Sequence, residues 1–305
     1  MAASGVVLFP AGKTPPAGGW PVIAWAHGST GVARSCAPSL RRNLGHGPLL
    51  SMYVNLGYAI VATDYTGLGT NFRNPFLDAP SNAVDVMASV TAARTAVHAL
   101  GPRWVVMGAA EAGLTALAVA ERENEIQDRG YLGALAVSNV ASLREMVDDP
   151  TQSSSSFKLA LLTYGTKTVY PQFQPTAVLT DKGLTLYRAM EQNCSNVGQL
   201  REIPAADAVK PGWKQNKFIR EYLDRSTPAR THSYGPVMII SGGGQPAFKL
   251  ISQTVSRMCQ LADQVQWQHY PGIEPGRVIG DSVRDQIAWI EARFAGRRPL
   301  TNCHQ

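Results

Sequence analysis

Short apolar runs alternate with longer segments of helical periodicity along most of the chain. The apolar runs predict strands over residues 6–9, 21–26, 58–63, 104–107, 132–137, 236–241 and 265–270. Small and apolar residues at helical spacing predict helices over 83–100, 114–120, 248–262 and 279–294, with Ser81 as the N-cap of the first. This alternation predicts an α/β fold with a mostly parallel sheet and helices on both faces.

One segment interrupts the alternation. Residues 148–230 contain a serine run at 153–156, several Tyr and Pro residues, and helical patterns without buried strands. Such an insertion between late strands is typical of a helical cap. We therefore expect a core made of residues 1–147 and 231–305, and a cap made of residues 148–230.

The composition is that of a folded protein with a large core. Of the 305 residues, 45% are hydrophobic and 16% are charged, which excludes a disordered chain and fits one large domain, with or without an inserted cap. No apolar run reaches the ~18 residues that span a bilayer. The segment MAASGVVLFPAGKTPP lacks a basic start and a long apolar stretch, so we expect no signal peptide and a cytoplasmic location for this chain.

The formal net charge is +6, but the basic residues are scattered. Without a basic stripe or a nucleic-acid motif, this charge is typical of ordinary solubility, and it also suits a small anionic ligand. We expect no nucleic-acid partner, no membrane partner and no cofactor, and a small molecule as the substrate. The oligomeric state stays open.

The four cysteines are Cys36, Cys194, Cys259 and Cys303. They form no CxxC motif or Cys/His cluster, which argues against a zinc site. Their number suits disulfides formed in an oxidising environment, and it equally suits buried free thiols.

The segment from Trp104 to Gly113 has the pattern of a strand, a tight turn of small residues and a helix. This is the context of the nucleophile elbow, G-x-S-x-G, in which a strained backbone points the central side chain above the sheet. Here Gly108 holds the first position, Ala110 holds the nucleophile position and Ala112 replaces the second glycine. The elbow is present in outline, without its hydroxyl.

Four further stretches are PVIAWAHGSTGVARSCAPSL at 21–40, LGYAIVATDYTGLGT at 56–70, PVMIISGGGQP at 236–246 and YPGIEPG at 270–276. With the elbow they resemble the secretory lipase family of the α/β-hydrolase fold, over nearly the whole chain. The resemblance implies a secreted ancestor, an inserted helical cap, and two disulfides, Cys36–Cys194 and Cys259–Cys303. The family's amino-terminal segment has no counterpart here, which would account for the missing signal peptide.

The resemblance also assigns the catalytic positions. In that family the elbow carries Ser, the end of a late strand carries Asp and a following loop carries His; these positions correspond to Ala110, Gln245 and Pro275. Alanine has no oxygen to attack with, glutamine has no charge to hold an imidazolium, and proline cannot act as a base. Acyl-enzyme hydrolysis by the Ser-His-Asp route is therefore excluded at this site.

The turn His27-Gly28-Ser29-Thr30-Gly31 follows the second predicted strand. The resemblance implies that this turn shapes an oxyanion hole, with backbone N–H groups pointing at a ligand oxygen. Ser29, close to His27, offers a replacement hydroxyl, but turn chemistry is the favoured interpretation.

Glu111 follows the vacated nucleophile position directly. A carboxylate at a helix N-terminus and beside an apolar cavity is favoured by the helix dipole and opposed by desolvation, and such a group makes a competent general base. Donors around residues 28–30 would stabilise the resulting enolate. The alternative interpretation is an ordinary acidic residue in the first turn of a helix.

A looser resemblance points to the acetate-eliminating enzymes of spirotetronate polyketide pathways, which have hydrolase-like folds and form an exocyclic double bond. It implies an anionic, polyketide-like substrate. Arg144 and Arg277 are candidate partners for that charge, or solvated surface residues. Tyr65 follows a strand end, where open α/β sheets place ligands, and it either donates a proton to substrate or packs.

Three functions remain. The leading hypothesis is a carbon–oxygen lyase that uses Glu111 as its base. The alternatives are a pseudo-hydrolase that binds an acyl or polyketide ligand, and a cyclase that folds its substrate by shape alone.

Overall fold

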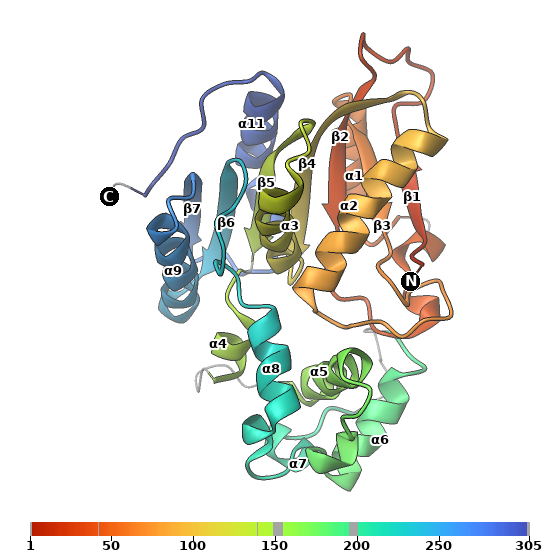
Figure 1. Cartoon of the computed structure of the whole chain (residues 1–305), viewed down its shortest axis with the longest axis vertical. Helices are drawn as coiled ribbons and strands as arrows, with labels where there is room; N and C mark the ends of the chain where they lie inside the picture. Colours follow the sequence, from red (N-terminus) through yellow and green to blue (C-terminus); the bar gives the residue numbers. More distant parts are fainter. Residues whose placement is uncertain (1, 42, 139, 149–154, 195–200, 304–305) are drawn as a thin grey trace.

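The computed structural model describes residues 2–41, 43–138, 140–148, 155–194 and 201–303. Its core is a sheet with the strand order β1-β3-β2-β4-β5-β6-β7 (Figure 1). All neighbouring strands are parallel except β1, which runs antiparallel to β3. The strands are β1 (Gly5–Leu8), β2 (Trp20–Ala26), β3 (Ala59–Thr63), β4 (Leu100–Ala110), β5 (Tyr131–Ser138), β6 (Val237–Gly243) and β7 (Val265–Pro271). The seven predicted strands are confirmed.

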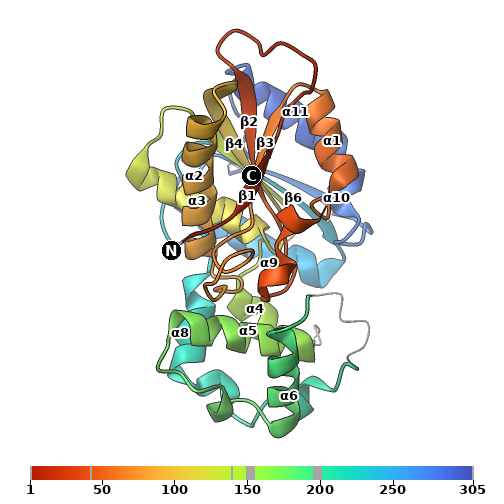
Figure 2. The ribbon, with the colours of Figure 1, turned by 90° about the vertical axis from the view of Figure 1, so that its right-hand side faces the viewer.

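Helices cover both faces of the sheet, as predicted (Figure 2). One face packs against α2 (Ala79–Ala96), α3 (Gly113–Ile126) and α9 (Gln245–Gln260). The other packs against α1 (Gly47–Asn55), α10 (Val278–Asp281) and α11 (Val283–Phe294). Because the sheet is buried on both sides, its central strands are almost continuously apolar. These apolar runs are the pattern from which the sequence predicts the strands.

Three helix predictions were wrong in detail. The helix predicted over 114–120 is α3, which continues to Ile126. The helix predicted over 83–100 begins at Ala79, and Ser81 is not its N-cap, because the Asp78 side chain caps it by accepting a hydrogen bond from the Ser81 N–H (3.3 Å). It ends at Ala96, because Leu100 already pairs with Trp20 at the start of β4. The helix predicted over 279–294 is two helices, α10 and α11, separated at Ser282. Helix α1 was not predicted.

Between β5 and β6 the described residues form helices and no strand of the sheet. These helices are α4 (Leu143–Asp148), α5 (Ser156–Val169), α6 (Asp181–Met190), α7 (Ala205–Ala208) and α8 (Lys217–Arg225). They lie together beyond one end of the sheet and share their own apolar cluster (Figure 1). They overlap the predicted cap at 148–230, of which residues 149–154 and 195–200 lie outside the described residues; the division into two separate units stays a prediction.

Covalent and ionic links fasten these helices to the core. Cys36 and Cys194 form one disulfide, which joins the cap to the loop after β2, and Cys259 and Cys303 form the other. Both pairings match the expectation. Arg225 of α8 also binds the fully buried carboxylate of Asp78 through two nitrogens, at 2.7 and 3.0 Å, which is the geometry of a strong ion pair.

The return from the cap to the core is fixed by a largely buried carboxylate. Glu121 on α3 accepts hydrogen bonds from the backbone N–H groups of Ala229 (2.7 Å) and Arg230 (3.3 Å). Burial raises the pKa of Glu121 from an ordinary 4.5 to about 6, against the effect of these two bonds. The folded protein therefore holds this proton more tightly than the unfolded chain does.

Stability is expected to fall as the pH rises from about 4.5 to about 6, because in this window the unfolded chain releases the Glu121 proton before the folded protein does. The loss is at most about 2 kcal/mol, and Glu121→Gln should lack it. Urea unfolding of both proteins between pH 4 and 7 measures the difference. Glu125→Gln, on the same helix, should follow the wild type; parallel curves for wild type and Glu121→Gln would contradict the assignment.

Candidate active site

The elbow keeps its strained backbone although it has lost its serine. Ala110 ends β4 with φ at 53°, in the left-handed region that non-glycine residues avoid. Gly108 allows the tight approach of strand and helix, because a Cβ there would lie 2.0 Å from the Ala112 carbonyl oxygen. The turn thus presents the Ala110 methyl group where the family resemblance places a nucleophile.

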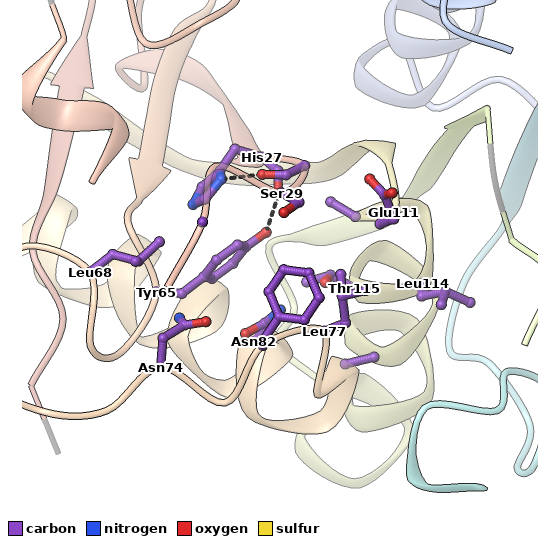
Figure 3. A pocket seen from close by; sticks show the side chains of 15 residues that line it. His27, Ser29, Tyr65, Leu68, Asn74, Leu77, Asn82, Glu111, Leu114 and Thr115 are labelled. Atoms are coloured by element: carbon purple, nitrogen blue, oxygen red, sulfur yellow. Dashed lines mark hydrogen bonds between the residues drawn. The ribbon is translucent and has the colours of Figure 1, made fainter. Parts of the chain in front are cut away.

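A narrow cavity opens beside the elbow (Figure 3). Its volume is about 20 Å³, enough for one or two waters. Its walls come from the turn after β2, the loop after β3, and the first turns of α2 and α3. The lining residues include His27, Gly28, Ser29, Tyr65, Leu68, Asn74, Leu77, Asn82, Glu111, Leu114 and Thr115.

Backbone strain gathers around this cavity. Tyr65 and Leu77, which line it, have φ values of 66° and 59°, and Ala110 borders it. A Cβ on Gly28 would lie only 3.3 Å from the Ala110 Cβ. Strained residues of this kind persist where the surrounding structure holds them, and they cluster at functional sites. The strain therefore marks this cavity as the candidate site.

His27 and Tyr65 form the rigid wall of the oxyanion turn. The two rings stack with centroids 4.3 Å apart, and the Tyr65 hydroxyl donates to the His27 carbonyl (3.1 Å). The His27 ring nitrogens face the carbonyl oxygens of Gly28 (2.7 Å) and Asp64 (3.3 Å). Burial lowers the pKa of His27 and raises that of Tyr65, so the imidazole is neutral and the phenol stays protonated near pH 7. This geometry gives His27 a structural role in the turn.

Glu111 lies at the rim of the cavity, with 29% of its side chain exposed. One carboxylate oxygen, Oε2, is 3.7 Å from the place a Cβ on Gly28 would take. The other, Oε1, is 3.8 Å from the Nζ of Lys158 on cap helix α5. The carboxylate thus lies between the oxyanion turn and a cation from the cap.

Sequence reasoning missed Lys158. A single lysine inside a predicted cap carries no signal, because the sequence does not show which cap helix covers the elbow. Within the described residues its ammonium makes no hydrogen bond, since 3.8 Å to Glu111 exceeds hydrogen-bonding distance.

The other two vacated triad positions lie at the same edge of the sheet. Ser138 ends β5 in register with Ala110, and its hydroxyl donates to the Pro275 carbonyl (2.9 Å). Gln245 begins α9 directly after β6 and is exposed, as is Pro275. The fold therefore brings Ala110 and Pro275 close, through Ser138.

The two predicted anion partners lie outside the lining of the cavity. Arg144 binds Asp224 (2.5 Å) and the Arg220 carbonyl (3.0 Å), so it joins α4 to α8. Arg277 is 72% exposed and pairs with Asp281 at 3.3 Å. Their role toward an anionic substrate stays a prediction.

Among the residues that the structure describes, no three His, Cys, Asp or Glu side chains group as metal ligands. Within these same described residues, no helix is both long enough and apolar enough to cross a membrane.

Solved structures share this architecture. A variant of the rice cell wall degrading esterase LipA from Xanthomonas oryzae matches with a TM-score of 0.78 at 18% identity, covering 97% of this chain and 87% of that one. Candida antarctica lipase A in its closed state matches with a TM-score of 0.81 at 15% identity, covering 99% of this chain and 75% of that one.

The chain has the α/β-hydrolase fold. This confirms the fold that the resemblance to secretory lipases implied. No family model and no curated protein sequence matches the chain. At these identities the α/β-hydrolase likeness establishes the architecture, and function has to be argued from the site.

Proposed function

We propose that this chain is a non-hydrolytic lyase of polyketide biosynthesis, in which Glu111 removes a proton from carbon and an acetate group leaves. The substrate class we favour is an acetylated tetronate. Glu111 takes the proton, the C–H electron pair becomes the second bond of an exocyclic C=C, and the C–O bond breaks with its electrons on acetate. Atoms and charge balance without an oxidant or reductant.

One observation carries this proposal: the Glu111 carboxylate faces the oxyanion turn where the elbow offers only the methyl group of Ala110. In this structure the cavity admits only one or two waters, so an ester binds here only when its walls move apart; it then meets a base and, at the elbow position, no nucleophile. A positioned general base contributes about 10²- to 10⁴-fold to a proton abstraction.

Lys158 supports the same chemistry. When Glu111 takes a proton it becomes neutral, and the negative charge moves to the substrate. An ammonium 3.8 Å from Oε1, with N–H donors unused by the described residues, can then turn to the developing enolate or the departing acetate. The backbone N–H groups of the turn after β2 and of Glu111 are the further donors we propose.

The direct test is to incubate the purified protein with a tetronate that carries an acetoxymethyl group next to the ring C–H. We expect equimolar acetate and a tetronate with an exocyclic methylene, seen by mass spectrometry and NMR. The hydroxymethyl tetronate, which is the product of ester hydrolysis, should be absent. Formation of that alcohol, or hydrolysis of p-nitrophenyl acetate at ordinary esterase rates, would overturn the proposal.

A further inference from the structure

The inner part of the cavity contains a buried amide without a partner. Asn82 lies in the first turn of α2, among Tyr65, Leu77 and Thr115 (Figure 3). It is 6% exposed, and its Oδ1 is buried with no hydrogen-bond partner. Within the described residues, no hydrogen bond reaches either end of its amide.

Two neighbouring polar groups are engaged. The Asn74 Nδ2 donates a hydrogen bond to the Thr66 carbonyl (2.8 Å), and the Tyr65 hydroxyl donates one to the His27 carbonyl. Asn82 is not needed as a cap, because Asp78 caps α2. A buried polar group without a partner is destabilising, so it persists where a ligand or a water completes it.

The chemistry of an amide defines the group it would bind. Its Oδ1 accepts a hydrogen bond and its Nδ2 donates one, so it suits a hydroxyl, and it also suits the same oxygen after ionisation. Phe76 and Leu77 are apolar neighbours of this amide, whereas Tyr65, Asn74 and Thr115 add polar groups to the same wall.

We propose that Asn82 is the specificity-determining residue of the cavity, and that it binds a hydroxyl or enol oxygen of the ligand while the acidic C–H of the same molecule faces Glu111. The ligand class is a carbonyl compound with such a hydroxyl. The placement of the acidic C–H against Glu111 rests on the proposed lyase function, whereas the binding of a hydroxyl by Asn82 does not.

Two probes isolate the hydroxyl. Tetronic acid and 2(5H)-furanone share the same five-membered lactone ring and differ in the 4-hydroxyl group, which is a vinylogous acid and carries a negative charge at neutral pH. Calorimetry or ligand-observed NMR should show that the wild type prefers tetronic acid by about tenfold to a hundredfold. In Asn82→Leu, which is similar in size but apolar, the two probes should bind alike, with the furanone affinity unchanged. Asn124→Leu, at an exposed position of α3, is the matched control and should keep the preference.

The outcomes separate the two proposals. A wild type that binds neither probe, or that shows no preference between them, overturns the hydroxyl subsite, and so does a preference that survives in Asn82→Leu. If the wild type eliminates acetate but does not prefer tetronic acid, the lyase proposal is supported and the hydroxyl subsite is contradicted. If the preference for tetronic acid is lost in Asn82→Leu but the wild type eliminates no acetate, the hydroxyl subsite is supported and the lyase proposal is contradicted. A thermal unfolding curve shows whether each variant is folded.

Discussion

Glu111→Gln is expected to lower the rate of elimination by about 10²- to 10⁴-fold. The substitution keeps the size and the hydrogen-bonding reach of the side chain and removes its basicity. The neighbours of the carboxylate, Gly28 and Lys158, are retained, so the cavity keeps its shape. Substrate affinity should change little, because the interaction that is lost belongs to the transition state. Single-turnover kinetics on the acetylated tetronate, with affinity measured on the hydroxymethyl analogue, separates the two effects.

The same variant distinguishes the three hypotheses. A protein that only binds its ligand has no elimination rate to lose, and Glu111→Gln should leave its affinity intact. A cyclase that works by shape should slow only modestly. Glu125→Gln is the matched control, since Glu125 lies on α3, the helix that follows Glu111, with 65% of its side chain exposed, and pairs with Arg122. If Glu111→Gln eliminates acetate as fast as the wild type, Glu111 is not the base.

Gly108→Ala is expected to cost about 3 kcal/mol or more of unfolding free energy, and to disturb the elbow. The added Cβ would lie 2.0 Å from the Ala112 carbonyl oxygen and 3.1 Å from the Ala116 side chain. Both neighbours belong to the junction of β4 and α3, where a backbone oxygen cannot move aside without breaking the helix start. The expected result is a much lower unfolding midpoint in urea.

Gly280→Ala is the matched control for this substitution. Gly280 lies in α10, has ordinary helical φ, and a Cβ there meets nothing within 4 Å. This variant should be neutral or stabilising by about 0.4–1 kcal/mol, because it restricts the unfolded chain. Equal midpoints for the two variants would mean that the elbow tolerates a side chain at its first position.

The elbow also shows why a site that has lost its nucleophile keeps the nucleophile's sequence pattern. Gly108 is retained for packing between strand and helix, which does not depend on chemistry at Ala110. The sequence therefore predicted the turn, its position between β4 and α3, and the absence of the attacking oxygen. The resemblance to secretory lipases further implied oxyanion donors around residues 28–30 near Glu111, and in the structure the Glu111 Oε2 lies 3.7 Å from the place a Cβ on Gly28 would take.

The strand and helix segments along the chain, the mostly parallel sheet with helices on both faces and the missing hydroxyl were determined by the sequence itself, because burial and turn geometry act on residues that are close in the chain. The order of the strands within the sheet was decided by the tertiary structure. The resemblance to secretory lipases further implied both disulfide pairings, which the structure contains. The tertiary structure alone decided that Lys158 of the cap lies next to Glu111, that Arg144 pairs with Asp224 away from the cavity, and that the Asn82 amide lacks a partner. The two ion pairs join segments separated by long stretches of chain, and the surroundings of Asn82 come from separate loops and helices, so no local pattern records them.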